Sequence, residues 1–385
     1  MNKPCPSTKL NEKNEPLPSS SLSIKEVQSE QWDKTITNFS DLRQEQLAIF
    51  INNRWPKLDT QYCLFEKKLD TNNKEAIAGA AVMIARVPFL GSGVAIIKWG
   101  PMLKDCADPE SSFSNYQACI NLLIQRYAVE QNLLLSILPS TFAEPREWQE
   151  TSLVEKGFSQ GKDLSFPDRY YVNLTIDTES QRKSYASKWR YHLKKSEQED
   201  LVFVHDTSDQ NLEIFMDLYR VMADRKQFPD YSAIETLPIL MSIEDKKLRP
   251  ELFLITKSTV TVAAAIIFKS SDSAVYLYGA TSDEALPLRA GYFMHDRIIQ
   301  WLSGNTHAKW YDLGGNDGFS GLHQFKKGMV GQHGSITQVP AIYTYGHSIK
   351  SRTIGRGLFL LKDIKTTLQQ RVEKWRSQLA TADLP

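Results

Sequence analysis

One segment of the chain carries polar side chains with catalytic chemistry around a glycine-rich loop. The segment KWYDLGGN (309–316) precedes HQFKKGMVG (323–331). Asp312 could orient an amine, His323 could relay a proton near neutral pH, and Lys326 could place a fixed ammonium beside developing negative charge. We predict that these three residues are catalytic.

Each of these residues also has a purely structural interpretation. Asp312 could cap a turn, His323 could be a structural histidine, and Lys326 could be a surface lysine. Arg225, at the end of an amphipathic pattern, could grip a phosphate or carboxylate with its guanidinium fork. It could equally be favoured there by the helix dipole. The residues alone leave these alternatives open.

The composition is that of an ordinary globular protein. The 385 residues include 46 Lys and Arg and 45 Asp and Glu, a net charge of +1, and 41% are hydrophobic. This excludes a disordered, collagenous or disulfide-scaffold protein and a uniformly basic nucleic-acid coat. The four cysteines (Cys5, Cys63, Cys106, Cys119) lack metal-ligand spacing, so we predict no metal site and a reducing, cytoplasmic location.

No segment favours export or membrane insertion. Residues 1–22 are rich in Pro, Ser, Asn and charge, which predicts a disordered tail without a secretory signal. Residues 76–97 are long enough to span a bilayer. However, Arg86, Pro88 and two glycines in their middle favour a hairpin between buried strands. We therefore expect no transmembrane segment.

The order of predicted elements occurs twice along the chain. In each half, a strand is followed by a strand of small residues, a third strand, an amphipathic helix and a buried strand. In the first half these elements are predicted at 62–67, 77–85, 94–103, 115–132 and 133–140. In the second half they are predicted at 252–257, 261–269, 274–282, 290–303 and 309–316. We infer two similar α/β units.

Further elements connect and flank the two units. A linking region (157–180) leads into a single basic helix (181–199), a strand (201–206) and a helix (211–228). Residues 335–346 read as extended, and a basic amphipathic helix at about 358–379 closes the chain.

Five local motifs make the chain resemble a known family. They are EQWD (30–33), WGPML (99–103), SKWRYHLKKSEQEDLVF (187–203), LYRVMADRKQF (218–228) and YDLGGN…FKKGMVG (311–331). With the element order, they resemble two GCN5-related N-acetyltransferase (GNAT) folds in tandem, the architecture of the Fem aminoacyltransferases. A long coiled-coil arm has no room between Arg182 and Asp200, so the pattern is closer to the broader, BioF2-like GNAT acyltransferases.

The resemblance implies an α/β fold of two tandem GNAT-like (acyl-CoA N-acyltransferase) domains, each a mixed central sheet flanked by helices. We expect a first domain at 23–175, a second, catalytic and acceptor-binding domain at 176–345, and a basic C-terminal helix within 346–385.

The resemblance also assigns binding roles. It implies that Lys326 and Arg225 contact substrate, together with Phe325 and Asn316. Splayed strands would supply an oxyanion donor near Tyr278 and Gly279, where glycine permits a bulge. Strand alternation places Tyr276 and Tyr278 on one face. Arg289 and Gly291, at a helix start, would hold the diphosphate of coenzyme A, although the second small residue of that loop is missing.

The function implied is N-acyl transfer to an amine on a sugar or a cell-envelope or polysaccharide precursor, with acyl-CoA as co-substrate and no tightly bound cofactor. One alternative is a Fem-type aminoacyltransferase that uses aminoacyl-tRNA and acts on a peptidoglycan precursor; the other is a decayed binding subunit. The basic residues within 182–195 could contact tRNA, and the terminal helix an anionic membrane. Solvated helix faces explain both charge patterns as well.

Overall fold

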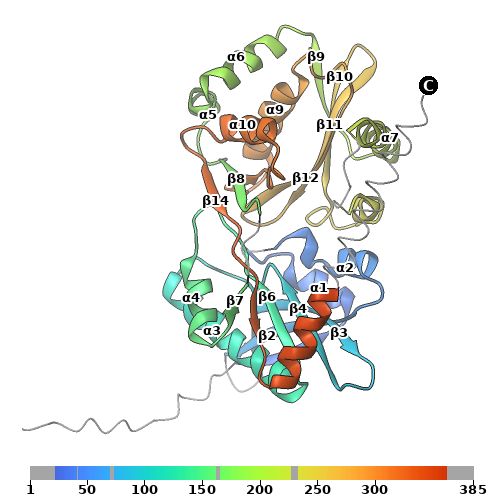
Figure 1. Cartoon of the computed structure of the whole chain (residues 1–385). Coiled ribbons are helices and arrows are strands. Elements are labelled where there is room, and N and C mark those ends of the chain that lie inside the picture. Colours follow the sequence, from blue (N-terminus) through green and yellow to red (C-terminus); the bar gives the residue numbers. More distant parts are fainter. Residues whose placement is uncertain (1–21, 41, 70–72, 162–164, 227–232, 362–385) are drawn as a thin grey trace, which may run out of the picture.

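The computed structural model describes residues 22–361 except 41, 70–72, 162–164 and 227–232. The chain forms two domains, each built on a mixed β-sheet with helices on its faces (Figure 1). The two-domain α/β architecture predicted from the sequence is confirmed. The predicted tail (1–22) lies outside the described residues except for Leu22, which begins the first strand.

The first domain follows the order β-α-α-β-β-β-α-β-α-β. Its elements are β1 (Leu22–Val27), α1 (Ser29–Ile36), the 3-10 turn η1 (Gln44–Gln46), α2 (Ala48–Arg54), β2 (Asp59–Lys68), β3 (Lys74–Val87), β4 (Ser92–Lys98), the short β5 (Met102–Leu103), α3 (Pro109–Leu123), the π-helical turn η2 (Ile124–Glu130), β6 (Leu133–Leu138), α4 (Glu147–Glu155) and β7 (Ser159–Gln160).

The second domain repeats that order after β8 (Asp168–Asn173), α5 (Thr178–Ser184) and α6 (Ser187–Ser196). The repeated elements are β9 (Leu201–His205), α7 (Asp209–Lys226), η3 (Ile234–Thr236), α8 (Leu237–Met241), β10 (Glu251–Lys257), β11 (Val260–Lys269), β12 (Ser273–Thr281), α9 (Ala290–Asn305), β13 (Trp310–Asp312), α10 (Ser320–Val330) and β14 (Ser335–Gln338). The duplication inferred from the sequence therefore extends from β1 to β7 in the first domain and from β9 to β14 in the second.

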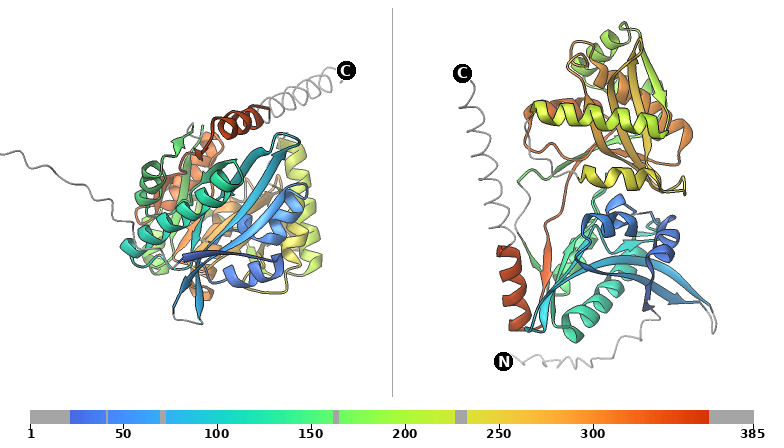
Figure 2. Two further views of the ribbon diagram at one scale, coloured as in Figure 1. Left: turned by 90° about the horizontal axis from the view of Figure 1, so that it is seen from below. Right: turned by 90° about the vertical axis from the view of Figure 1, so that its right-hand side faces the viewer.

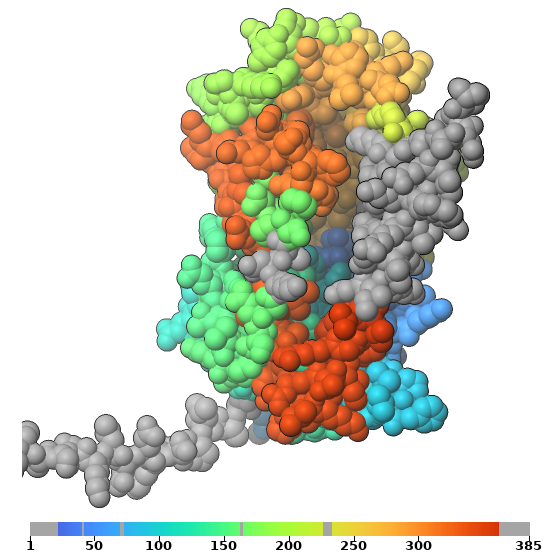
Figure 3. Space-filling model, in the orientation of Figure 1, coloured from blue at the N-terminus to red at the C-terminus, as the bar shows by residue number. Residues whose placement is uncertain are grey.

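Each sheet is completed by a strand from outside its own repeat. The first sheet has the order β1-β2-β3-β4-β6-β15-β7, in which β15 (Tyr343–Tyr345) returns from the end of the second domain. The second has the order β9-β10-β11-β12-β13-β8-β14. The predicted boundaries at 175 and 345 are therefore wrong at both points, because β8 belongs to the second sheet and β15 to the first. The segment that leads from β14 to β15 passes from the second domain to the first, on the face seen in Figure 3.

The small residues of β3 have a packing role. Trp32, from the EQWD motif on α1, is fully buried. A β-carbon at Gly79 would lie 2.9 Å from its indole ring, so this strand position must be glycine for the helix to pack closely. The predicted hairpin at 76–97 is confirmed as the antiparallel pair β3–β4. In the described part of the chain, no helix is long and apolar enough to cross a bilayer.

Several predicted elements differ from the observed ones. The single basic helix breaks into α5 and α6 because Tyr185 and Ala186 adopt extended backbone. The linking region contains β7 and β8, and the glycine-punctuated segment around Lys326 is the helix α10.

The C-terminal helix begins at Ile349, nine residues earlier than predicted, and continues to the end of the described residues at 361. It lies against the first domain (Figure 2), where Gly355 packs on Leu134. The rest of the predicted helix, up to 379, falls outside the described residues.

An apolar cluster joins the two domains. The first domain contributes Phe39, Leu47 and Phe50, and the second contributes Leu240 and Phe268. Burial of this shared surface stabilises one arrangement of the domains relative to each other. That arrangement determines which first-domain side chains reach the second sheet.

Candidate active site

Strands β12 and β13 diverge part-way along their length. β12 pairs with β11 from Ala263↔Thr281 to Lys269↔Ala274, but with β13 only from Ser273↔Trp310 to Val275↔Asp312. Beyond these three pairs, Tyr276–Thr281 has no partner strand on that side. The matching strands of the first domain, β4 and β6, stay paired over six residues from Gly93↔Leu133 to Lys98↔Leu138. The second sheet alone therefore opens a gap between two parallel strands.

A β-bulge lies on the open edge of β12. Tyr278 pairs with Ile266 and Tyr276 with Ile267, so Leu277 is the extra residue. The bulge puts the two tyrosines on opposite faces: Tyr276 packs on His295 of α9, whereas the Tyr278 hydroxyl donates to the Ala233 carbonyl at 3.1 Å. The prediction that both tyrosines share a face is therefore wrong.

Gly279 has a different role from the predicted one. The bulge occurs at Leu277, and Gly279 itself pairs regularly with Ala265. A β-carbon at Gly279 would lie 1.5 Å from the Tyr276 hydroxyl oxygen. Glycine is thus required because the Tyr276 side chain folds back over this position.

Asp312 ends β13 and is fully buried between two arginines. Arg169 of β8 donates from Nε to Oδ1 at 2.9 Å and to Oδ2 at 2.7 Å. Arg43, from the first domain, donates from Nη1 to Oδ2 at 3.0 Å. Burial alone would raise the Asp312 pKa, but the two guanidinium groups hold that pKa below its usual value. Asp312 is therefore an ionised carboxylate at the domain interface.

Lys326 lies on α10 with its ammonium under the loop that follows Asp312. Its Nζ donates to the carbonyl of Leu313 at 2.6 Å and to that of Gly315. The side chain is 6% exposed. Burial lowers the Lys326 pKa to about 8. The interpretation of Lys326 as an ordinary surface lysine is excluded, whereas its neighbour Lys327 is exposed.

His323 and Asn316 both form hydrogen bonds with the hydroxyl group of Tyr170. The Tyr170 hydroxyl lies 2.5 Å from His323 Nδ1, and Asn316 Nδ2 donates to it at 2.7 Å. Asn316 Oδ1 also accepts from the Gly318 amide at 2.8 Å, which fixes the glycine-rich loop. Four predicted residues (Asp312, Asn316, His323, Lys326) therefore gather around residues 313–318.

The other predicted residues lie apart from this group. Arg225 is exposed at the end of α7, where it pairs with Asp283 and donates to the Thr281 carbonyl at 3.1 Å, at the far end of β12. Phe325 points into the core against Tyr292 and His295 rather than into an open site.

Arg289 and Gly291 mark the start of α9, as predicted. Arg289 precedes the helix with a φ of 54° and donates to His192 at 3.2 Å. A β-carbon at Gly291 would meet only Phe325, at 3.8 Å. Figure 1 shows α9 and α10 on one face of the second sheet and α7 on the other.

Comparisons with known proteins agree with this geometry. Residues 180–327 match the acetyltransferase (GNAT) domain family. The second domain is a GNAT-type acetyltransferase domain. No curated protein matches the chain in sequence.

Solved structures share the fold of the whole chain. FemX has a TM-score of 0.64 at 14% identity, covering 84% of this chain and 97% of that one. L-PGS from Bacillus licheniformis has a TM-score of 0.51 at 12% identity, covering 89% and 96%. A conserved protein of unknown function from Bacteroides thetaiotaomicron has 0.56 at 11%, covering 84% and 98%. The chain therefore shares the fold of these structures, as the resemblance to tandem GNAT folds implied.

Sequence reasoning missed both cations that hold Asp312. Arg43 is 269 residues from its partner, and Arg169 lies in the segment expected to be a linker. Both are outside residues 180–327, which match the GNAT domain. The WGPML motif was the available signal, because the Trp99 ring stacks with both guanidinium groups, at 5.1 and 5.3 Å from its centroid.

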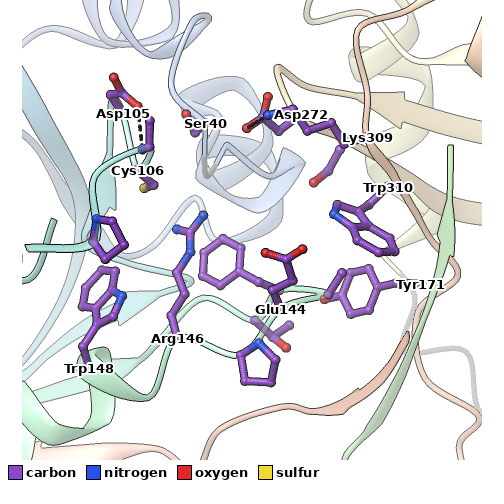
Figure 4. Close-up of a pocket in the computed structure, with 17 residues that line it drawn as sticks. Ser40, Asp105, Cys106, Glu144, Arg146, Trp148, Tyr171, Asp272, Lys309 and Trp310 are labelled. Atoms are coloured by element: carbon purple, nitrogen blue, oxygen red, sulfur yellow. Dashed lines mark hydrogen bonds and ion pairs between the residues drawn. The ribbon is translucent and has the colours of Figure 1, made fainter. Parts of the chain in front are cut away.

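A cavity of about 740 Å³ opens between the two domains. In Figure 4, the Glu144 carboxylate and the Arg146 guanidinium point into it, with Trp310 and Lys309 on the opposite wall. None of the predicted site residues lines it. Thr141 and Tyr171 do, and Thr141 accepts a hydrogen bond from Arg43.

The two arginines of the basic segment 182–195 are engaged within the second domain, whereas Lys188, Lys194 and Lys195 are exposed. Arg182 pairs with Asp296 and Glu197, and Arg190 donates to two backbone carbonyls. Tyr185 and Trp189 are buried. Their rings are thus core residues rather than stacking platforms for bases.

The depressed pKa of Lys326 predicts a specific pH dependence of stability. The unfolded chain binds the Lys326 proton up to about pH 10.5, but the folded protein only up to about pH 8. Lys326 therefore increases the free energy of unfolding as pH rises from 8 to 10. Relative to Lys326→Met, the wild type should gain about 2 kcal/mol across that range in urea titrations. The exposed control Lys327→Met should track the wild type, and parallel curves for all three proteins would contradict the assignment.

Proposed function

We propose that this protein transfers an acyl group from acyl-CoA to an amine on a sugar or a cell-envelope or polysaccharide precursor. The observation that carries the proposal is the divergence of β12 from β13 beside Lys326 and Asp312. A gap between parallel strands exposes backbone amides that can bind an extended chain on one side and a carbonyl oxygen at its end. The resemblance to GNAT folds implies that such splayed strands supply the oxyanion donor.

The donor would lie along β12 with its diphosphate at the start of α9. The amides of the first turn and the positive end of the helix dipole favour an anion there. Gly291 leaves the approach open, and Arg289 stands beside it. The thioester carbonyl would then face the free edge at Tyr276–Tyr278, where the bulge changes the direction of the amides.

Transfer needs little beyond orientation and charge placement. The amine nitrogen attacks the thioester carbon, a C–N bond forms, the C–S bond breaks, and the thiolate leaves. The Lys326 ammonium, held by two carbonyls, would supply positive potential near the developing oxyanion. The excess amine proton would pass through the His323–Tyr170 pair.

The acceptor and the setting rest on the resemblance to Fem-like enzymes. We place the reaction in the cytoplasm, in keeping with the thiols of Cys63 and Cys119, which form no disulfide. Peripheral membrane contact through the C-terminal helix is supported by exposed Ile349, Leu360 and Leu361 beside Arg352 and Arg356. Such contact would bring the enzyme to a lipid-linked precursor.

Donor binding should be visible as thermal stabilisation. Acetyl-CoA or CoA at about 100 times its Kd should add about 2.7 kcal/mol and raise Tm by a few degrees. Arg289→Gln should weaken this shift, because it removes a cation beside the diphosphate. Arg297→Gln, on the same helix but paired with Glu197, should not. The absence of a shift up to millimolar CoA would contradict the acyl-CoA donor and favour aminoacyl-tRNA.

Turnover should depend on Lys326. With acetyl-CoA and a panel of amino sugars, thiol release by wild-type protein should fall about 10²- to 10³-fold in Lys326→Met. The CoA-induced shift in Tm should persist in this variant, and Lys327→Met should keep its activity. A wild type that binds CoA yet transfers to no amine offered would instead point to a binding subunit.

A further inference from the structure

The loop after Asp312 is held from two directions. On one side, Arg43 and Arg169 hold the Asp312 carboxylate, whose Oδ1 also accepts from the Gly314 amide at 2.9 Å. On the other side, Lys326 binds the Leu313 and Gly315 carbonyls. Movement of the carboxylate would therefore displace the carbonyls that hold the ammonium.

Arg43 is itself fixed by the first domain. It is 7% exposed, and its Nη2 donates to the Thr141 carbonyl at 2.6 Å. Its guanidinium stacks on Trp99, whose carbonyl accepts from Gln46 Nε2 at 2.8 Å and whose indole N–H donates to Glu45. This arginine is a rigid part of the first domain that reaches into the second.

The segment that matches the GNAT domain family, residues 180–327, does not contain the counter-charges of its own carboxylate. Asp312 and Lys326 lie within residues 180–327, whereas Arg169 comes from β8 and Arg43 from the other domain. A buried carboxylate without its partners costs several kcal/mol. The position of Asp312 thus depends on how the two domains meet.

We propose that Arg43 is a positioning residue of the acyl-transfer site: reaching from the first domain, it fixes Asp312 and thereby the carbonyls that hold Lys326. The inference rests on the proposed function only for the role of Lys326 in transfer. The placement of Lys326 by Arg43 can be tested without donor or acceptor. The positioning role of Arg43 and the proposed acyl transfer can therefore fail independently of each other.

Removal of Arg43 should change the Lys326 pKa in a definite direction. The charged and titratable groups that influence Lys326 are Asp312, Asp317, Arg169 and the neutral, buried His295. Without Arg43, the Asp312 charge is less neutralised and the loop can open to water. Both changes favour the protonated ammonium, so the Lys326 pKa should rise toward its ordinary value.

The test measures labelling of Lys326 by acetic anhydride as a function of pH, with peptide mass spectrometry as readout. In the full-length wild type, the midpoint should be near the Lys326 pKa of about 8. In Arg43→Gln it should rise by about one pH unit or more, a tenfold gain in proton affinity. Lys327 serves as an internal reference. If burial prevents acetic anhydride from labelling Lys326 in the wild type, Lys326 should become labelled in Arg43→Gln.

The matched control is Arg54→Gln. Arg54 also joins the domains, through an ion pair with Glu235, but at the surface and away from Asp312. It should leave the Lys326 profile unchanged. If Arg43→Gln does not fold, Arg43→Lys replaces it: this variant keeps the charge but cannot serve Asp312 and Thr141 together, and its midpoint should rise less. An unchanged Lys326 profile in the folded Arg43 variant, or an equal change in the matching Arg54 variant, overturns the proposal.

Discussion

The structure depends on keeping one carboxylate charged in the interior. Asp312 has no solvent contact, and an unpaired carboxylate there would cost several kcal/mol. Two arginines and a backbone amide offset that cost, and one of the arginines belongs to the other domain. The same contacts fix the loop over Lys326. The way in which the two domains pack therefore also determines the geometry of the site.

The duplicated domains have diverged in a way that follows from strand pairing. Both have the same element order, and both sheets take their sixth strand from outside the repeat. Only β12 and β13 separate after three pairs, whereas β4 and β6 stay joined. In the described part of the first domain, β4 and β6 leave no comparable gap, and this domain contributes Arg43, Trp99 and the apolar interface instead. It acts as a support for the second domain.

The sequence predicted the parts of this account that depend on local pattern. Alternation and apolar spacing placed β10–β12 within a residue, because each of these strands pairs with a neighbour close along the chain. The place of Lys326 close to the glycine-rich loop was also predicted, since the two segments adjoin in the sequence.

Interactions between distant segments could not be predicted in the same way. The Leu277 bulge changes the phase of β12, so simple alternation gave the wrong face for Tyr276. Arg43 and β15 act only after the domains meet, and no local pattern marks a residue for a partner 269 positions away. The break at Tyr185 follows from packing against α9, where its hydroxyl lies 3.4 Å from Asp296.

The most direct measurement of the central claim is a double-mutant cycle on Arg43 and Asp312. Urea unfolding of Arg43→Gln, Asp312→Asn and the double variant at neutral pH gives their coupling free energy. The account predicts that each single variant loses about 3 kcal/mol or more. It also predicts that the double variant loses little beyond the larger single loss, a coupling of about 2 kcal/mol or more. Losses that add to within about 0.5 kcal/mol would show that the two residues act independently and would contradict the account.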